Sequence, residues 1–128
     1  MDYPSLARMA GMGEFGRHGM LISPFNGACQ RIEAVFTNLK LPVERSNPHK
    51  WVRDYCASCG NCIRACPPNA IREESVPTRG GHYSCVETRK CLLYLVTHFG
   101  CSICVKECPF TTRGYDRVKE SFDRGARG

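Results

Sequence analysis

Residues 56–67 read CASCGNCIRACP, and this stretch decides the fold. Its cysteines follow the pattern C-x2-C-x2-C-x3-C-P and are Cys56, Cys59, Cys62 and Cys66. Three thiolates at this spacing can wrap around three irons of one cubane cluster, and the fourth cysteine then points to another cluster. The stretch therefore predicts half of a ferredoxin-like module that binds two [4Fe-4S] clusters.

A second cysteine motif, CSICVKECP at residues 101–109, repeats the end of the first at a constant offset of 42 residues. The matching pairs are Cys59 with Cys101, Cys62 with Cys104, and Cys66 with Cys108. Such a repeat implies two pseudo-symmetric halves, each of which lends one cysteine to the cluster of the other half. The ligands expected for the first cluster are Cys56, Cys59, Cys62 and Cys108. Those expected for the second are Cys66, Cys101, Cys104 and one further residue.

The fourth ligand of the second cluster is the one position that the repeat leaves open. Exact symmetry would place it at residue 98, which is His98, but imidazole ligation belongs mainly to two-iron Rieske centres. We prefer Cys91, which can reach back to the cluster if the surrounding residues form a helix lying over it. Cys85 is the weaker alternative.

Composition limits the other classes of function. Ten of the 128 residues are cysteine, and no segment approaches the roughly 18 consecutive apolar residues that span a bilayer. We therefore expect a cytoplasmic protein without a membrane span, where reducing conditions argue against a disulfide scaffold. The formal charge of +6 comes from scattered Lys and Arg residues, so no nucleic-acid partner is expected. No hydrolase motif is present.

The N-terminal part predicts a small structured unit, residues 1–48. Residues 1–10 predict one short helix, while residues 20–23 and 31–41 predict two strands that pair as a hairpin. The remaining residues, 49–128, predict the ferredoxin-like domain with a short C-terminal tail. The whole chain is therefore expected to have an α+β fold.

Within residues 49–128, three segments outside the cysteine motifs carry a prediction. The Gly- and Pro-containing stretch 72–84 is expected to be a loop. Residues 87–99 are apolar enough for a helix, and the tail from residue 113 predicts a short helix with a frayed end.

The stretch AGMGEFGRHGMLISP, residues 10–24, contains the G-x-G-x-x-G spacing of dinucleotide-binding proteins at Gly11, Gly13 and Gly16. That fingerprint needs a strand before it and a helix after it, so that the phosphates meet a helix N-terminus. No strand precedes these glycines, and we expect a helix exit and a tight turn into a strand instead. Arg17 and His18 are expected to face solvent.

The sequence resembles one family over most of its length. The segment AGMGEFGRHGMLISPFNGACQRIEAVFTN (10–38), the first cysteine motif, and KCLLYLVTHFGCSICVKECPF (90–110) are similar to the C-terminal part of corrinoid-dependent reductive dehalogenases. Epoxyqueuosine reductases are more distantly similar. The resemblance implies that residues 1–48 are the end of a nitroreductase-like, corrinoid-binding domain. It also supports Cys91, because the second motif of these enzymes has a lone upstream cysteine.

The resemblance and the motifs together predict transfer of electrons one at a time through two [4Fe-4S] clusters. The expected role is the electron-relay portion of a reductive-dehalogenase-like oxidoreductase, not catalytically complete alone, whose partner is a corrinoid domain or a redox protein. A corrinoid is expected only if that domain is present, and no catalytic or corrinoid-binding residue is assigned here. The alternatives are a stand-alone ferredoxin-type carrier and a structural metal-binding module, for which zinc is the competing metal.

Overall fold

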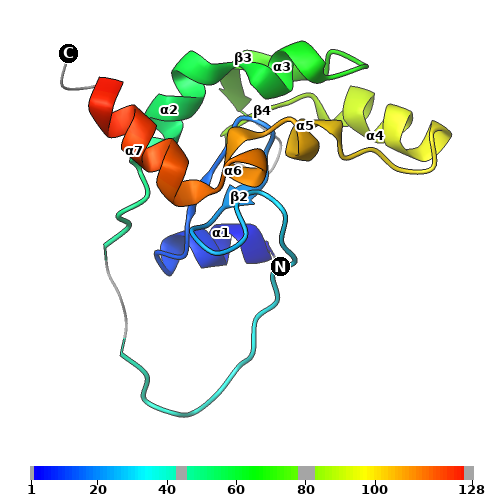
Figure 1. The fold of residues 1–128 in the computed structure, drawn as a ribbon. Helices are drawn as coiled ribbons and strands as arrows, with labels where there is room; N and C mark the ends of the chain where they lie inside the picture. The colour runs from blue at the N-terminus through cyan, green and yellow to red at the C-terminus, as the bar shows by residue number, and fades with distance from the viewer. Residues whose placement is uncertain (1, 43–45, 78–82, 126–128) are drawn as a thin grey trace.

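The computed structural model describes residues 2–42, 46–77 and 83–125. Short helices and two antiparallel hairpins occupy these ranges, which confirms the expected α+β class. In chain order the elements are α1 (Tyr3–Met9), β1 (Glu14–Phe15), β2 (Leu21–Ile22), α2 (Trp51–Cys59), α3 (Asn61–Ala65), β3 (Ile71–Pro77), β4 (Tyr83–Val86), α4 (Thr88–Thr97), α5 (Ile103–Lys106), α6 (Pro109–Thr112) and α7 (Tyr115–Gly125). Helices α4 and α7 project from opposite sides of the molecule (Figure 1).

Helix α1 lies where the sequence predicts a helix. The Asp2 carboxylate accepts a hydrogen bond from the Ser5 N–H at 3.3 Å and so caps the helix. Pro4 lies in the first turn, where its missing N–H costs no helical hydrogen bond. The helix ends at Met9, and Gly11 then adopts a φ of +72°, which a glycine reaches without steric cost.

The glycines that follow α1 shape the β1–β2 hairpin. Its strands pair antiparallel with Glu14 opposite Ile22, and the Gly19 N–H donates to the Gly16 carbonyl at 2.9 Å across the turn. A Cβ atom at Gly13 would lie 2.2 Å from the Ile22 carbonyl oxygen, so a side chain there would clash with the backbone. The helix exit and tight turn expected for this stretch are confirmed.

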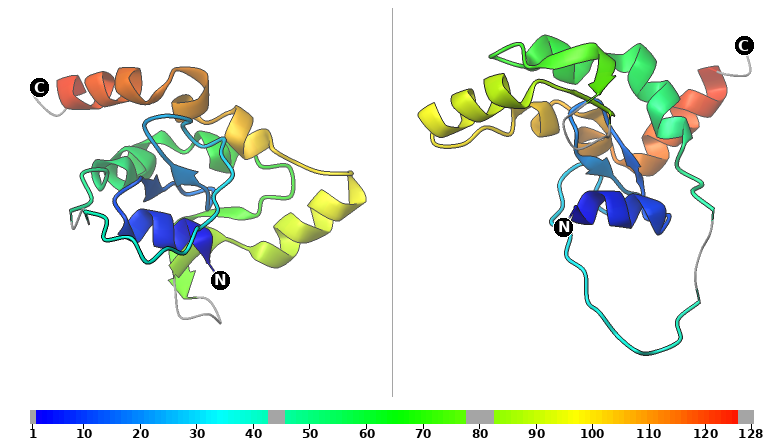
Figure 2. Two further views of the ribbon diagram at one scale, coloured as in Figure 1. Left: turned by 90° about the horizontal axis from the view of Figure 1, so that it is seen from below. Right: turned by 180° about the vertical axis from the view of Figure 1, so that it is seen from behind.

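The strand predicted at residues 20–23 is confirmed as β2, but the partner predicted for it is wrong. Residues 31–41 form no strand, and Figures 1 and 2 show them running away from the helices and sheets. Their apolar side chains are exposed, Val35 by 91% and Phe36 by 78%. β1 pairs with β2 instead because closing the short glycine turn costs less chain entropy than closing the longer loop would.

The prediction of a loop at residues 72–84 is wrong for most of that range. Strands β3 and β4 form a second antiparallel hairpin, in which Ile71 pairs with Val86 and Val76 with Ser84. The apolar alternation of a half-buried strand is missing because only Ile71, at the start of β3, is buried. Residues 78–82 lie outside the described residues.

The two helices predicted after this hairpin are confirmed as α4 and α7. The frayed end predicted for the tail falls on residues 126–128, outside the described residues. None of the helices described is both long and apolar enough to cross a membrane.

One apolar core joins the two parts of the chain. It consists of Ile22, Ala28, Val52, Cys108, Phe110, Tyr115 and Val118. Trp51 and Tyr55 cover it, with ring centroids 5.6 and 5.2 Å from that of Phe110. Because Ile22 and Ala28 pack with residues of the cysteine region, the expected units 1–48 and 49–128 share this core, and the boundary between them stays a prediction.

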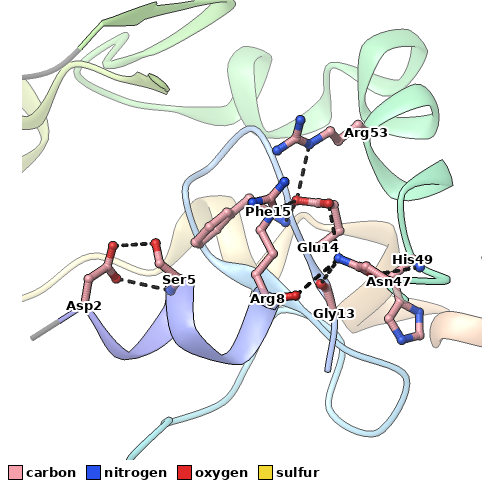
Figure 3. Close-up of polar contacts among 9 residues, drawn as sticks. All are labelled: Asp2, Ser5, Arg8, Gly13, Glu14, Phe15, Asn47, His49 and Arg53. Carbon is pink, nitrogen blue, oxygen red and sulfur yellow. Dashed lines mark hydrogen bonds and ion pairs between the residues drawn. The ribbon is translucent and has the colours of Figure 1, made fainter. Parts of the chain in front are cut away.

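A buried carboxylate adds a polar tie between the same two parts (Figure 3). Glu14 is 0% exposed, and its Oε1 accepts from Arg8 Nε at 2.6 Å and lies 3.2 Å from Arg53 Nε. The Phe15 N–H donates to the same oxygen at 3.0 Å. Asn47 donates to the other carboxylate oxygen at 3.4 Å. Glu14 thus links α1, β1, the segment before α2, and α2 itself.

We expect Glu14→Ala to lower the free energy of unfolding by about 2 kcal/mol, because the half-buried Phe15 N–H and two guanidinium groups lose their acceptor. Chemical denaturation measures the change. Glu33→Ala removes an exposed carboxylate and should shift the stability by no more than about 0.5 kcal/mol. Equal effects of the two substitutions would contradict this account of Glu14.

Candidate metal centre

Four of the predicted ligands lie around one pocket. Cys56 and Cys59 belong to α2, Cys62 belongs to α3, and Cys108 is the N-cap of α6. The break between α2 and α3 at Gly60, where φ is +66°, allows thiols from two consecutive helices to face a common space. The pocket is lined by these four cysteines and by His18, Tyr55, Gly60, Asn61, Pro109 and Phe110.

The electrostatics of this first pocket suit a cationic cofactor. Burial, joined by repulsion from neighbouring thiolates, raises the pKa of Cys56 to about 12 and that of Cys62 to about 11. Burial likewise raises the pKa of Cys108. Several thiolates can share this pocket only when positive metal ions compensate them. Thiolates are soft ligands that favour soft metal centres, and iron–sulfur clusters are one class of these. The four cysteines therefore fit the expected [4Fe-4S] cluster.

Backbone N–H groups also face the sulfur atoms of the first pocket. Arg17, in the turn of the β1–β2 hairpin, donates its N–H to Cys56 and so lowers the pKa that burial has raised. The backbone N–H of Phe110 acts in the same way on Cys108. Such hydrogen bonds stabilise negative charge on ligating sulfurs.

The remaining predicted ligands lie together in a second group. Cys66 is the C-cap of α3, Cys91 lies in α4, Cys104 lies in α5, and Cys101 precedes α5. The pKa of Cys91 is raised by burial and then by the nearby thiols of Cys66 and Cys101. The Ala70 N–H donates to Cys66 Sγ at 3.3 Å. The structure therefore brings Cys91 to the other three members of this group.

The two alternative ligands lie elsewhere. Cys85 lies in β4 and lines a different cavity, of about 710 Å³, together with Phe15 and Arg17. His98 is the exposed C-cap of α4, and its ring stacks on that of Tyr94 with centroids 3.9 Å apart. Among the described residues, no three His, Cys, Asp or Glu side chains are placed to hold a single metal ion.

Sequence reasoning missed His18 as part of the site. It was expected to face solvent, and this expectation is wrong, because the side chain is 5% exposed and lines the first pocket. The signal was available in Gly16. A Cβ atom at that position would lie 2.8 Å from His18 Cε1, so the glycine makes room for the ring.

Comparison with known proteins gives the class of this site. Residues 55–112 match the family profile described as a 4Fe-4S dicluster domain. This part of the chain is therefore a 4Fe-4S dicluster domain, as the cysteine repeat predicts.

The same comparison places the chain among particular relatives. It is 35% identical over 112 residues to the tetrachloroethene reductive dehalogenase of Sulfurospirillum multivorans. The aligned region covers 80% of this chain and 22% of that protein. It is 42% identical over 73 residues to the enzyme of the same name from Desulfitobacterium hafniense, covering 56% and 13%. Epoxyqueuosine reductase of Gloeobacter violaceus is 30% identical over 141 residues, covering 94% and 40%.

A solved structure agrees with these relatives. The catabolic reductive dehalogenase NpRdhA, in complex with 3-bromo-4-hydroxybenzoic acid, matches with a TM-score of 0.73 and 27% identity, covering 94% of this chain and 18% of that one. The chain is thus homologous to a part of reductive dehalogenases and of epoxyqueuosine reductases. It spans between 13% and 40% of the length of the relatives named here.

We expect Cys91→Ala to remove or convert one of the two clusters, and Cys85→Ala to leave both intact, because Cys91 lies with the second group and Cys85 does not. Iron and acid-labile sulfide analysis, with electron paramagnetic resonance of the reduced protein, distinguishes the outcomes. Loss of a cluster in Cys85→Ala and not in Cys91→Ala would reverse the assignment.

Proposed function

We propose that this chain is the electron-relay part of a larger corrinoid-dependent oxidoreductase related to the reductive dehalogenases, and that it is not catalytically complete alone. The first cluster is held by Cys56, Cys59, Cys62 and Cys108. The second is held by Cys66, Cys91, Cys101 and Cys104. The partner is a corrinoid domain or a redox protein that exchanges electrons with these sites.

The exchange of cysteines between the two repeats carries this proposal. Cys108 of the second repeat lies with the thiols of the first pocket, and Cys66 of the first repeat lies beside Cys91. After burial, the Cys62 thiol is the strongest influence that raises the pKa of Cys104, to about 11. The two groups are therefore neighbours, as an electron relay requires.

The protein's own residues hold and tune the cofactors. When bound, each [4Fe-4S] cluster supplies a centre that accepts and releases one electron at a time. The thiolates fix its position, and backbone N–H groups such as that of Arg17 stabilise negative charge on them. Tyr55 and Phe110 line the first pocket and limit the access of water. Burial and hydrogen bonding are the means by which a protein sets the potential of a cluster.

Exposed apolar side chains support a partner domain. The segment 31–41 exposes Val35, Phe36, Leu39 and Leu41, each by at least 63%. On α4, Leu92, Leu93 and Val96 are exposed by at least 55%. Exposed apolar side chains gathered on one segment and on one helix are typical of contacts with other protein, which favours a larger assembly over a free carrier.

The cavity beside the β1–β2 hairpin is where we place the partner's cofactor. Phe15, Gly16, Arg17 and Gly19 line it, and so do Arg8 and Arg53 of the helices on either side. Arg8 and Arg53 pair with Glu14, and Asp2 and Glu73 also line the cavity. Arg17 is therefore the guanidinium outside that network that suits an anionic part of a large ligand. The same turn gives its Arg17 N–H to Cys56, so this cavity adjoins the first cluster pocket.

We also propose that the protein works in the cytoplasm. All ten cysteines are free in the structure, as expected of thiols kept reduced for cluster assembly. Fractionation of cells that express the full-length protein tests the location, and recovery in an oxidising compartment would overturn it.

Analysis of the anaerobically assembled chain should give about eight iron and eight sulfide per molecule, the content of two four-iron clusters. Cys108→Ala should lose the first cluster although it lies in the second motif, and Cys66→Ala should lose the second although it lies in the first. Each variant should retain about half of the iron. Bound zinc without sulfide would overturn the proposal in favour of a structural metal module.

The coding sequence upstream of this chain distinguishes the electron-relay proposal from the alternative of a free carrier. A continuous reading frame upstream that encodes a corrinoid domain would support the relay. An in-frame stop codon directly before the codon for Met1 would overturn it in favour of the carrier.

A further inference from the structure

The turn between β1 and β2 lies against the first cluster pocket. Its Arg17 N–H donates to the Cys56 thiol, and the next side chain, His18, lines the pocket together with the four cysteines. A residue of the N-terminal hairpin therefore reaches a site whose cysteines all come from α2, α3 and the start of α6.

The hydrogen bond at Nδ1 determines which ring nitrogen of His18 carries a proton. The Met20 N–H donates to His18 Nδ1 at 3.1 Å, so Nδ1 is an acceptor. An imidazole whose Nδ1 accepts a hydrogen bond carries its one proton on Nε2. Nε2–H is therefore a hydrogen-bond donor.

This donor has no acceptor within the described part of the chain. His18 Nε2 is buried and makes no hydrogen bond to any described residue. The ring lies against Gly16, where a Cβ atom would lie 3.1 Å from Nε2. Buried polar groups in proteins are nearly always hydrogen-bonded, so an orphaned donor beside a cofactor pocket points to an acceptor on the cofactor.

We propose that His18 Nε2–H donates a hydrogen bond to a sulfur atom of the first cluster and raises the reduction potential of that cluster. The proposal rests on the ligand assignment for the first cluster given above. A donor stabilises the reduced state more than the oxidised state, because the reduced cluster carries one more negative charge. His18 is thus a positioning and tuning residue rather than a ligand.

Three variants of the chain assembled with iron and sulfide test this role. His18→Leu removes the donor, and His18→Gln keeps an N–H of similar reach. His98→Leu is the matched control, because it removes a histidine that is exposed on α4. Redox titration followed by electron paramagnetic resonance should show a lower midpoint potential for one cluster in His18→Leu. The potential should return toward the wild-type value in His18→Gln and stay unchanged in His98→Leu.

A second measurement uses the unaltered sequence. In protein labelled with ¹⁵N-histidine, pulsed electron paramagnetic resonance of the reduced state should detect a weak coupling between one cluster and a ring nitrogen. That coupling should disappear in His18→Leu and persist in His98→Leu. If His18→Leu does not assemble its cluster, the coupling in the wild-type chain and its loss in His18→Gln decide the question.

The outcomes separate this inference from the proposed function. A wild-type chain that fails to bind iron and sulfide contradicts the cluster assignment itself. A wild-type chain that binds both clusters but shows no histidine coupling, or equal potentials in wild type and His18→Leu, overturns only the role of His18.

Discussion

The burial of several cysteine thiols side by side is the constraint on which the rest of this structure depends. Cysteines separated by as many as 52 residues, from Cys56 to Cys108, meet around one pocket. Burial and neighbouring negative charge raise the pKa values of several of them. Without metal these thiols stay protonated. When a cluster is bound, its iron ions supply the positive charge that balances the thiolates, which the apolar surroundings cannot do. This fold can therefore hold thiolates side by side only with the cofactor bound.

The neighbouring elements serve this arrangement. Gly60 breaks the helical run so that α2 and α3 present thiols to one space, and Pro109 begins α6 directly after Cys108. The N-terminal hairpin contributes more than packing, because its turn brings the Arg17 N–H and the His18 ring to the first pocket. Glu14 holds that hairpin against α2 through Arg53. The charge network around Glu14 thus positions parts of the cluster site.

The sequence could predict what depends on local spacing and could not predict what depends on long-range packing. The cysteine repeat, α1, β2, α4 and α7 follow from motifs and periodicity within a few residues. The alternating pattern at 31–41 was misleading, because most of its large apolar residues, such as Val35 and Phe36, are exposed. The β3–β4 hairpin was missed because backbone pairing holds a nearly all-exposed strand. His18 was missed because the other residues lining its pocket come from α2, α3 and the start of α6, far away in sequence.

Cys108 has a double position that couples cluster binding to the stability of the apolar core. It is a cluster ligand in our assignment and also a member of the apolar core, where it is 5% exposed beside Phe110 and Val118. Binding energy of a metal centre built into a core becomes folding energy. Oxidative loss of the first cluster would therefore loosen the centre of the molecule, and cellular proteases would clear the damaged copies while intact ones persist. The presence of the cluster would then distinguish intact copies from damaged ones, in addition to its role in carrying electrons.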